Sequence, residues 1–162
     1  YQAFMVPVVQ RCGGSIDKFL GDGIMATFGA GKPSETAAAD ALRAMEGVLE
    51  AARAWNAMRA AAGYDQALTV NAAAASGMLI WGAVGDESRL EYTVIGDPVN
   101  LAAKLEKHNK AMGVAALTTG AMLDAALAQG YRPAHPPARV PGALVGGIDE
   151  PLELAVIDPG AG

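Results

Sequence analysis

Side chains able to do chemistry gather in two segments of the sequence, 13–29 and 82–106. In the first segment Asp22 lies between two glycines, where a tight turn leaves its carboxylate facing solvent and lets backbone approach a ligand closely. Mg²⁺ is usually held by one or two carboxylates together with phosphate oxygens, so Asp22 suits such an ion. The simpler interpretation is that Asp22 only makes the turn, and the spacing alone favours it.

Two polar residues on predicted strands are weaker candidates. Alternation along a strand predicts that Lys18 faces away from Asp17 and Phe19, so Lys18 projects into a cleft while Phe19 packs inward. A lone strand lysine is more often a solvated edge charge. Thr93 is an ordinary strand residue and indicates less on its own.

Asn100 and Lys104 form a third candidate pair, four residues apart on a helix predicted to begin near Pro98. They share a face that differs from the apolar stripe of Leu101 and Leu105. An amide donor and an ammonium near a helix N-terminus suit a triphosphate whose charge shifts during a reaction. An exposed polar face is the more common reason for such a pair.

The elements that must position these residues alternate between helices and strands. Asp97 and Pro98 are expected as the N-cap and first-turn pair of one helix, and Ser76 and Gly77 join two of the strands. A Pro-rich stretch covers 133–141. Since at least one hairpin is antiparallel, we expect an α+β sandwich of helices over a mixed sheet. In chain order the predictions are a helix over 1–12, strands over 15–20 and 24–28, a helix over 33–62, strands over 68–75, 78–84 and 90–95, a helix over 97–112, a strand over 114–117, a helix over 119–128 and a strand over 152–157.

Composition limits the classes of function. With 162 residues and 52% hydrophobic content, the sequence predicts a single domain over 1–162. The net charge of −5, without a clustered Lys/Arg run, argues against a nucleic acid or an anionic membrane as partner. A nucleotide site needs only a few local positive charges and is not excluded.

Cysteine usage and hydropathy bear on the compartment. Cys12 is the only cysteine, so an intrachain disulfide is impossible and a reducing cytosol is the simplest location. No apolar run reaches the roughly twenty residues that span a bilayer, so no direct membrane insertion is expected of this segment. We expect a cytoplasmic domain, on its own or as the cytosolic module of a larger or membrane-attached protein.

Together the two segments are far more specific than their parts. Ile-Asp-Lys-Phe-Leu-Gly-Asp-Gly at 16–23, followed by Glu-Tyr-Thr-Val-Ile-Gly-Asp-Pro-Val-Asn-Leu-Ala at 91–102, closely resembles the class III adenylate and guanylate cyclase family. The resemblance extends to the closing segment 147–154. It implies a ferredoxin-like βαββαβ core of the cyclase type, with a mixed sheet covered by helices and a C-terminal extension.

The resemblance also implies an activity and residue roles. In that family two metal ions, Mg²⁺ or Mn²⁺, bind two aspartates and the triphosphate while the 3′-hydroxyl of ATP attacks the α-phosphorus, which yields cyclic AMP and pyrophosphate. Asp22 matches the second of those aspartates, and Asn100 matches the asparagine that positions the ribose. Lys18 and Thr93 match the residues that read adenine; guanine-specific members tend to carry a glutamate and a cysteine there, so ATP is favoured over GTP.

The same resemblance implies a partner. The family forms each active site between two subunits, with metal aspartates from one and base-reading and transition-state residues from the other. This chain carries both kinds, so a head-to-tail homodimer with two sites is implied.

The sequence also departs from the family pattern. The family's first strand, with the other metal aspartate, is expected upstream of Tyr1, which leaves this segment without that strand and without the start of its first helix. Lys104 stands where the family usually has the arginine that stabilises the pentavalent phosphorus, and lysine lacks its planar fork. Asn71 also stands where active members often have an arginine. Segment 145–148 lacks a phosphate-binding lysine seen in some members, although Arg139 is nearby.

These departures leave alternatives open. The first is a catalytically weak or inactive cyclase-homology domain that binds nucleotide or dimerises as a regulatory module. The second is a ferredoxin-like nucleotide-binding domain with polymerase-palm chemistry, which would need a second carboxylate close to Asp22.

Overall fold

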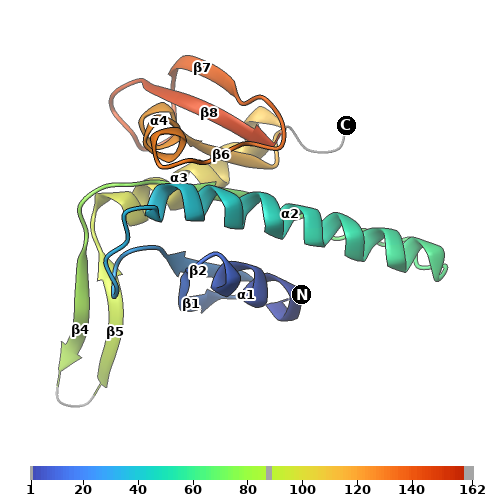
Figure 1. The fold of residues 1–162 in the computed structure, drawn as a ribbon, viewed down its shortest axis with the longest axis horizontal. Helices are drawn as coiled ribbons and strands as arrows, with labels where there is room; N and C mark the ends of the chain where they lie inside the picture. The colour runs from blue at the N-terminus through green and yellow to red at the C-terminus, as the bar shows by residue number, and fades with distance from the viewer. Residues whose placement is uncertain (1, 87–88, 159–162) are drawn as a thin grey trace.

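The computed structural model describes residues 2–86 and 89–158, and Figure 1 shows their arrangement. Each predicted helix is present, which confirms that part of the sequence analysis. The elements are α1 (Gln2–Arg11), β1 (Ser15–Leu20), β2 (Gly23–Thr27), α2 (Ala37–Ala61), β3 (Ala72–Ala74), β4 (Ile80–Asp86), β5 (Arg89–Ile95), α3 (Asp97–Met112), β6 (Ala116–Thr119), α4 (Gly120–Ala128), β7 (Ala138–Ala143) and β8 (Leu152–Asp158).

The strands pair in three groups over the described residues. β1 and β2 form an antiparallel hairpin, and so do β4 and β5, which project from the body as an arm (Figure 1). The third group has the order β3-β6-β8-β7, in which only the β3–β6 pair is parallel. Helices against mixed strand pairing confirm the predicted α+β class.

Two strand predictions need correction. Of the segment 68–75, expected as one strand, only Ala72–Ala74 forms β3, which pairs with β6, whereas β4 pairs with β5. The strand β7 begins inside the Pro-rich stretch 133–141, ends at Ala143 and was not predicted. Because proline has no N–H to donate, it is tolerated on an edge strand, and Pro141 lies where the pairing of β7 with β8 is irregular.

Helix α2 is the central support of the fold. It runs between the four-stranded sheet and the layer formed by α1 and the β1–β2 hairpin (Figure 1). Leu42, Met45, Leu49 and Ala52 form its buried stripe, as the helical spacing predicted. Trp55 follows on the same stripe and contacts the Phe4 ring, with centroids 6.5 Å apart. The hairpin and the sheet are therefore held to one rigid helix.

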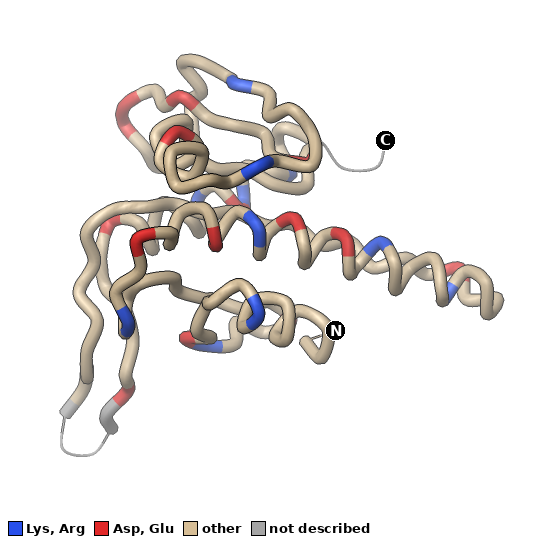
Figure 2. The backbone as a smooth tube through the Cα atoms, viewed as in Figure 1, with Lys and Arg blue, Asp and Glu red and all other residues tan. Residues whose placement is uncertain are grey.

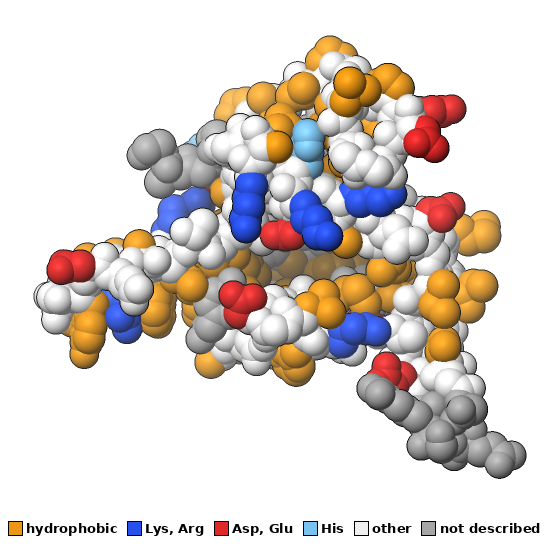
Figure 3. All heavy atoms as spheres, turned by 180° about the vertical axis from the view of Figure 1, so that it is seen from behind, with side chains coloured by type: hydrophobic (Ala, Val, Ile, Leu, Met, Phe, Trp, Pro, Cys, Tyr) orange, Lys and Arg blue, Asp and Glu red, His pale blue; other side chains and the backbone are white. Residues whose placement is uncertain are grey.

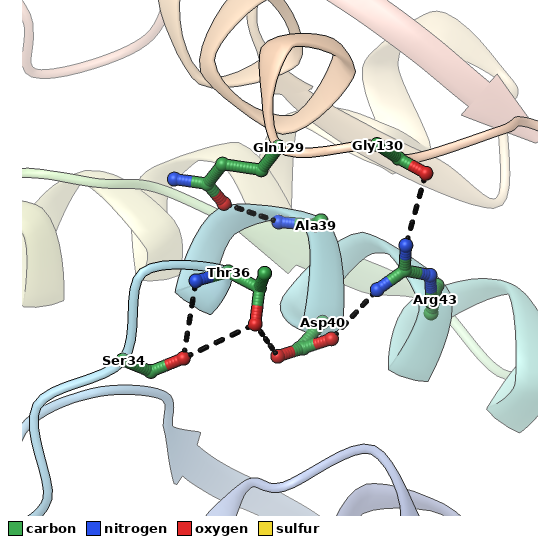
Figure 4. Close-up of polar contacts among 7 residues, drawn as sticks. All are labelled: Ser34, Thr36, Ala39, Asp40, Arg43, Gln129 and Gly130. Atoms are coloured by element: carbon green, nitrogen blue, oxygen red, sulfur yellow. Dashed lines mark hydrogen bonds and ion pairs between the residues drawn. The ribbon is translucent and has the colours of Figure 1, made fainter.

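The N-terminus of α2 is capped by another helix's end. Sequence signals placed its start at Pro33, whereas the helix begins at Ala37. The Ala39 N–H donates to the Gln129 side chain just after α4, 3.0 Å away (Figure 4). A side chain 90 residues away in sequence thus satisfies a backbone donor that a local cap normally takes.

Arg43 adds a second link between the same two helix ends. Its guanidinium donates to the Gly130 carbonyl at 3.0 Å and to Asp40 at 2.7 Å (Figure 4). Asp40 also accepts from the Thr36 hydroxyl at 2.7 Å, so Thr36 uses its hydroxyl on a side chain and makes no side-chain cap bond. These contacts fix α4 against the start of α2.

Helix α3 is anchored through buried contacts on both sides. Gly96, rather than the predicted Asp97, is its N-cap residue, and Asp97 is its first helical residue. Leu105 packs in a small core of its own with Val145 and Leu154. The Asn109 side chain donates to the Ala72 carbonyl at 2.9 Å, which ties the helix to β3.

Candidate active site

The β1–β2 hairpin presents Asp22 at its tip. Leu20 pairs with Gly23, so the loop is the two residues Gly21 and Asp22. Gly21 has a φ of 63° and Asp22 has a negative φ, which is the pattern of a type II′ turn. The positive φ thus falls on the glycine before the aspartate. The Asp22 side chain is exposed.

A β-bulge in β1 changes which side chains face the same way. Ile16 pairs with Ala26 and Lys18 with Met25, so Asp17 is an extra residue in the ladder. Asp17 and Lys18 consequently both reach the neighbouring strand β5. The prediction that alternation would send Lys18 away from Asp17 is wrong, because a bulge interrupts alternation.

The bulge brings the two predicted base-reading residues together. Lys18 Nζ donates to Thr93 Oγ1 at 2.8 Å, although the residues are 75 apart in sequence. The Thr93 hydroxyl in turn donates to Asp17 Oδ2 at 3.0 Å, and Lys18 Nζ lies 3.4 Å from the same Asp17 oxygen. We call Asp17, Lys18 and Thr93 the base cluster.

Burial within the base cluster is uneven. The Asp17 side chain is 4% exposed and Thr93 is 8% exposed, whereas the Lys18 side chain is 37% exposed. The lysine head is therefore the accessible member, held by two buried oxygens. Phe19, which was predicted to pack inward, is 55% exposed.

Asp17 is a functional candidate that the sequence reasoning missed. Its signal was its place directly before Lys18 in the first segment, but strand alternation assigned it to the opposite face. A pocket of about 240 Å³ also opens beside it. The pocket is lined by Ser15, Ile16, Asp17, Thr27, Gly31, Trp81 and Tyr92, so Asp17 is the one member of the base cluster among its lining residues.

Asn100 and Lys104 lie on the first turns of α3, as predicted. Asn100 is exposed, and Lys104 is half-buried. Lys104 Nζ donates to the carbonyl of Gly147, in the loop before β8. A Cβ on Gly147 would stand 3.2 Å from Lys104 Cε, so the lysine stem lies directly over that loop.

Arg139, the cation nearest in sequence to segment 145–148, is engaged elsewhere. It forms ion pairs with Asp124 and with Glu153, the latter at 2.7 Å. These partners raise the pKa of its guanidinium above the usual range. Arg139 thus links α4, β7 and β8 on the surface.

Acidic side chains do not gather into a metal centre within residues 2–86 and 89–158. No group of three or more His, Cys, Asp and Glu there is placed to hold an ion. A metal at Asp22 would therefore need ligands from a bound nucleotide or from another carboxylate. In the same residues, no helix is long and apolar enough to cross a membrane.

Basic side chains and exposed hydrophobic side chains are distributed differently over the molecule. Lys and Arg are spread over several elements rather than gathered on one (Figure 2). Hydrophobic side chains are prominent near the arm and in the hollow of the face seen in Figure 3. Large exposed apolar residues on or beside β4 and β5 are Met78, Ile80, Trp81, Val84, Tyr92 and Ile95.

Comparison with known proteins assigns these features to a family. No family model matches the chain. Adenylate cyclase 1 of Rhizobium meliloti is 34% identical over 116 residues, which cover 72% of this chain and 17% of that protein. The chain spans between 5% and 23% of the length of the curated adenylate cyclases that it matches.

Solved structures agree with the sequence relatives. The adenylyl cyclase CyaB from P. aeruginosa superposes with a TM-score of 0.75 at 24% identity, over 100% of this chain and 79% of that chain. The guanylyl cyclase Cya2 superposes with a TM-score of 0.67 at 28% identity, over 95% of this chain and 73% of that chain. With both motifs in place and the cyclase fold around them, the chain belongs to the class III adenylate and guanylate cyclase catalytic domain family.

Proposed function

We propose that this domain is an adenylate cyclase, which converts ATP to 3′,5′-cyclic AMP and pyrophosphate in cyclic nucleotide signalling. The observation that carries the proposal is the Lys18–Thr93 hydrogen bond of 2.8 Å. It joins residues from the two sequence motifs, and both were assigned to adenine recognition from the family resemblance. A lysine held by two buried oxygens has lost much of its freedom before a ligand binds, which lowers the cost of binding.

Asp22 is the proposed metal ligand. An exposed carboxylate at a glycine-containing tip fits Mg²⁺ or Mn²⁺, which take oxygen ligands and are commonly completed by phosphate oxygens and water. A pair of such ions would activate the 3′-hydroxyl and neutralise charge on the phosphates. Asp22 supplies one carboxylate, and the second aspartate is expected from the strand predicted upstream of this segment.

Asn100 and Lys104 are the proposed catalytic residues. Asn100 is exposed near the start of α3, where its amide can orient the ribose. Lys104 would neutralise charge on the reacting phosphorus with the ammonium hydrogens that its bond to the Gly147 carbonyl leaves free. A bond between an ammonium and a phosphate, which are both charged, is stronger than a bond from an ammonium to a neutral carbonyl, so a bound phosphate would compete well for these hydrogens.

The proposed enzyme acts as a head-to-tail homodimer. In this arrangement Asp22 of one copy faces the base cluster and Asn100 of the other. Exposed apolar residues support an interface near these elements, because Phe19 and Leu20 on the hairpin and Trp81 and Ile95 on the arm are each about half exposed.

A second candidate function is a nucleotide-binding or dimerising regulatory module without turnover. The bond between Lys104 and the Gly147 carbonyl favours it, because that bond holds the ammonium against a loop of its own chain. The base cluster is equally compatible with binding alone.

Cyclic AMP formation from ATP with Mn²⁺, in the full natural protein, separates the two. We expect Asp22→Asn to lower kcat by about 1,000-fold, since metal stabilisation of the transition state is worth several kcal/mol. Asp65→Asn is the matched control, because Asp65 is also an exposed loop aspartate and should leave activity unchanged. Nucleotide binding without any cyclic product, in the wild type and with either metal, would support the regulatory module instead.

A further inference from the structure

We propose that Asp17 is a specificity-determining residue, which makes the site select adenine over guanine by fixing the direction of the Thr93 hydroxyl. This inference rests on the proposed nucleotide site and adds to it a residue that contacts no purine itself. Asp17 acts through Thr93 and Lys18, so it is a positioning residue.

The chemistry of the three groups leaves one arrangement of hydrogens. An ammonium can only donate and a carboxylate can only accept, whereas a hydroxyl has one hydrogen and two lone pairs. Thr93 Oγ1 lies 2.8 Å from Lys18 Nζ and 3.0 Å from Asp17 Oδ2. The hydroxyl must therefore accept from Lys18 and give its only hydrogen to Asp17.

Burial makes this arrangement persistent. The Asp17 side chain is 4% exposed, so water does not compete effectively for its oxygens. Leaving that carboxylate without Thr93 and Lys18 would strand a buried charge, which is costly. Thr93 thus has one lone pair left for a ligand and no hydrogen to offer.

The hydrogen-bonding capacity that the base cluster has left for a ligand matches one purine. Thr93 can accept from an exocyclic amino group, and Lys18 has a further hydrogen for a ring nitrogen that accepts. Adenine presents that pair, an amino group at position 6 and an acceptor at N1. Guanine presents the reverse, a carbonyl at position 6 and an N1–H, so Thr93 would face an acceptor and Lys18 a donor.

Without Asp17 the Thr93 hydrogen is released and can turn toward a carbonyl. The residue that chooses the base is then the bulged Asp17, because Thr93 alone is compatible with either a donor or an acceptor. A threonine at this position reads adenine only when a buried acceptor stands behind it.

The test uses two nearly isosteric replacements in the full natural protein. Asp17→Leu removes the acceptor, and Asp17→Asn keeps it, because the amide NH₂ is repelled by the Lys18 ammonium and the amide oxygen then faces Thr93. The readout is the ratio of dissociation constants for 3′-deoxy-GTP and 3′-deoxy-ATP by calorimetry, since these analogues cannot cyclise. We expect Asp17→Leu to lower the preference for adenine by roughly tenfold and Asp17→Asn to keep it within about threefold.

A double-mutant cycle tests the route through Thr93. Thr93→Val removes the hydroxyl at constant shape, and in that background Asp17→Leu should change the base preference much less. Circular dichroism and the melting temperature check folding, and Asp17→Ala replaces Asp17→Leu if the leucine variant does not fold.

The outcomes that overturn the inference are distinct from those that refute the activity. If Asp17→Leu weakened the binding of both analogues equally, the role of Asp17 would be merely structural. An effect on base preference of the same size in the Thr93→Val background would exclude the route through the hydroxyl. A wild type without preference for either base also overturns it. A wild type that prefers adenine yet forms no cyclic AMP refutes only the enzymatic proposal.

Discussion

The two halves of the proposed site differ in how far a single chain completes them. In the base cluster, Lys18 and Thr93 already touch each other and share the buried Asp17. On α3, Asn100 is exposed and Lys104 is bonded to a loop carbonyl. The proposed recognition of the base is thus organised in advance, whereas Lys104 has yet to meet its proposed phosphate partner. In the proposed site, substrate choice and turnover therefore depend on separate parts of the molecule.

The largest expected effect comes from mixing two inactive variants. In the proposed homodimer each site takes Asp22 from one copy and Asn100 from the other. Asp22→Asn and Asn100→Ala each remove one of these two residues. Half of the dimers in an equal mixture are mixed, and one of their two sites carries both wild-type residues. Mixing should therefore restore about a quarter of wild-type cyclic AMP formation. Activity that stays at the level of the single variants would show that both residues serve the same site from one chain.

Replacement of Lys18 should affect recognition of the base and not turnover in general. Lys18→Met keeps the stem but removes the ammonium, and a hydrogen bond from a charged group is worth about 1.5–3 kcal/mol. We expect kcat/KM for ATP to fall roughly 50-fold while kcat/KM for GTP changes little. Lys104→Met is the matched comparison and should lower kcat/KM for ATP and for GTP by the same factor. An effect of Lys104→Met that differs between the two substrates would contradict the division between base recognition and turnover.

Lys104→Arg should improve turnover. A guanidinium can bond two phosphate oxygens at once through its planar fork, which an ammonium cannot do. We expect kcat to rise by about tenfold with the ATP/GTP preference unchanged. Lys107→Arg controls for the charge and the helix, because Lys107 is exposed on the same helix. An unchanged or lower kcat would indicate that residue 104 remains on the Gly147 loop and does not act on the phosphates.

The smallest expected effect concerns the scaffold that both halves share. Gln129→Ala removes the side chain that accepts from the Ala39 N–H, and loss of a helix cap typically costs about 1 kcal/mol. For a chain of this size the melting temperature should fall by roughly 2–4 °C. Gln66→Ala, at an exposed loop position, should leave the melting temperature unchanged. A drop of the same size in both variants would argue against a capping role for Gln129.

The elements were largely predictable, since they follow from periodicity and turn residues. The apolar stripe of α2 and the hairpin around Asp22 are local features of the sequence, and both are confirmed. The late start of α2 was not predictable, because its capping acceptor belongs to Gln129. Strand β7 was missed because proline usually marks loops, although an edge strand tolerates it.

The site was predictable only in part. The meeting of Lys18 and Thr93 followed from the family resemblance and from no local pattern. Asp17 was assigned to the wrong face, because the position of a bulge depends on how two strands pair and not on either strand alone. The contact of Lys104 with Gly147 depends on a distant loop and left no signal in the helix.

The bulge in β1 has a consequence for how such a domain can diversify. A residue that the ladder does not pair can change its chemistry without shifting the backbone hydrogen bonds of its neighbours. The residue at position 17 can therefore be an acceptor, a donor or an apolar group while the hairpin still presents Asp22 at its tip. Relatives with the same motifs and different residues at this one position would be expected to differ in the purine that they favour.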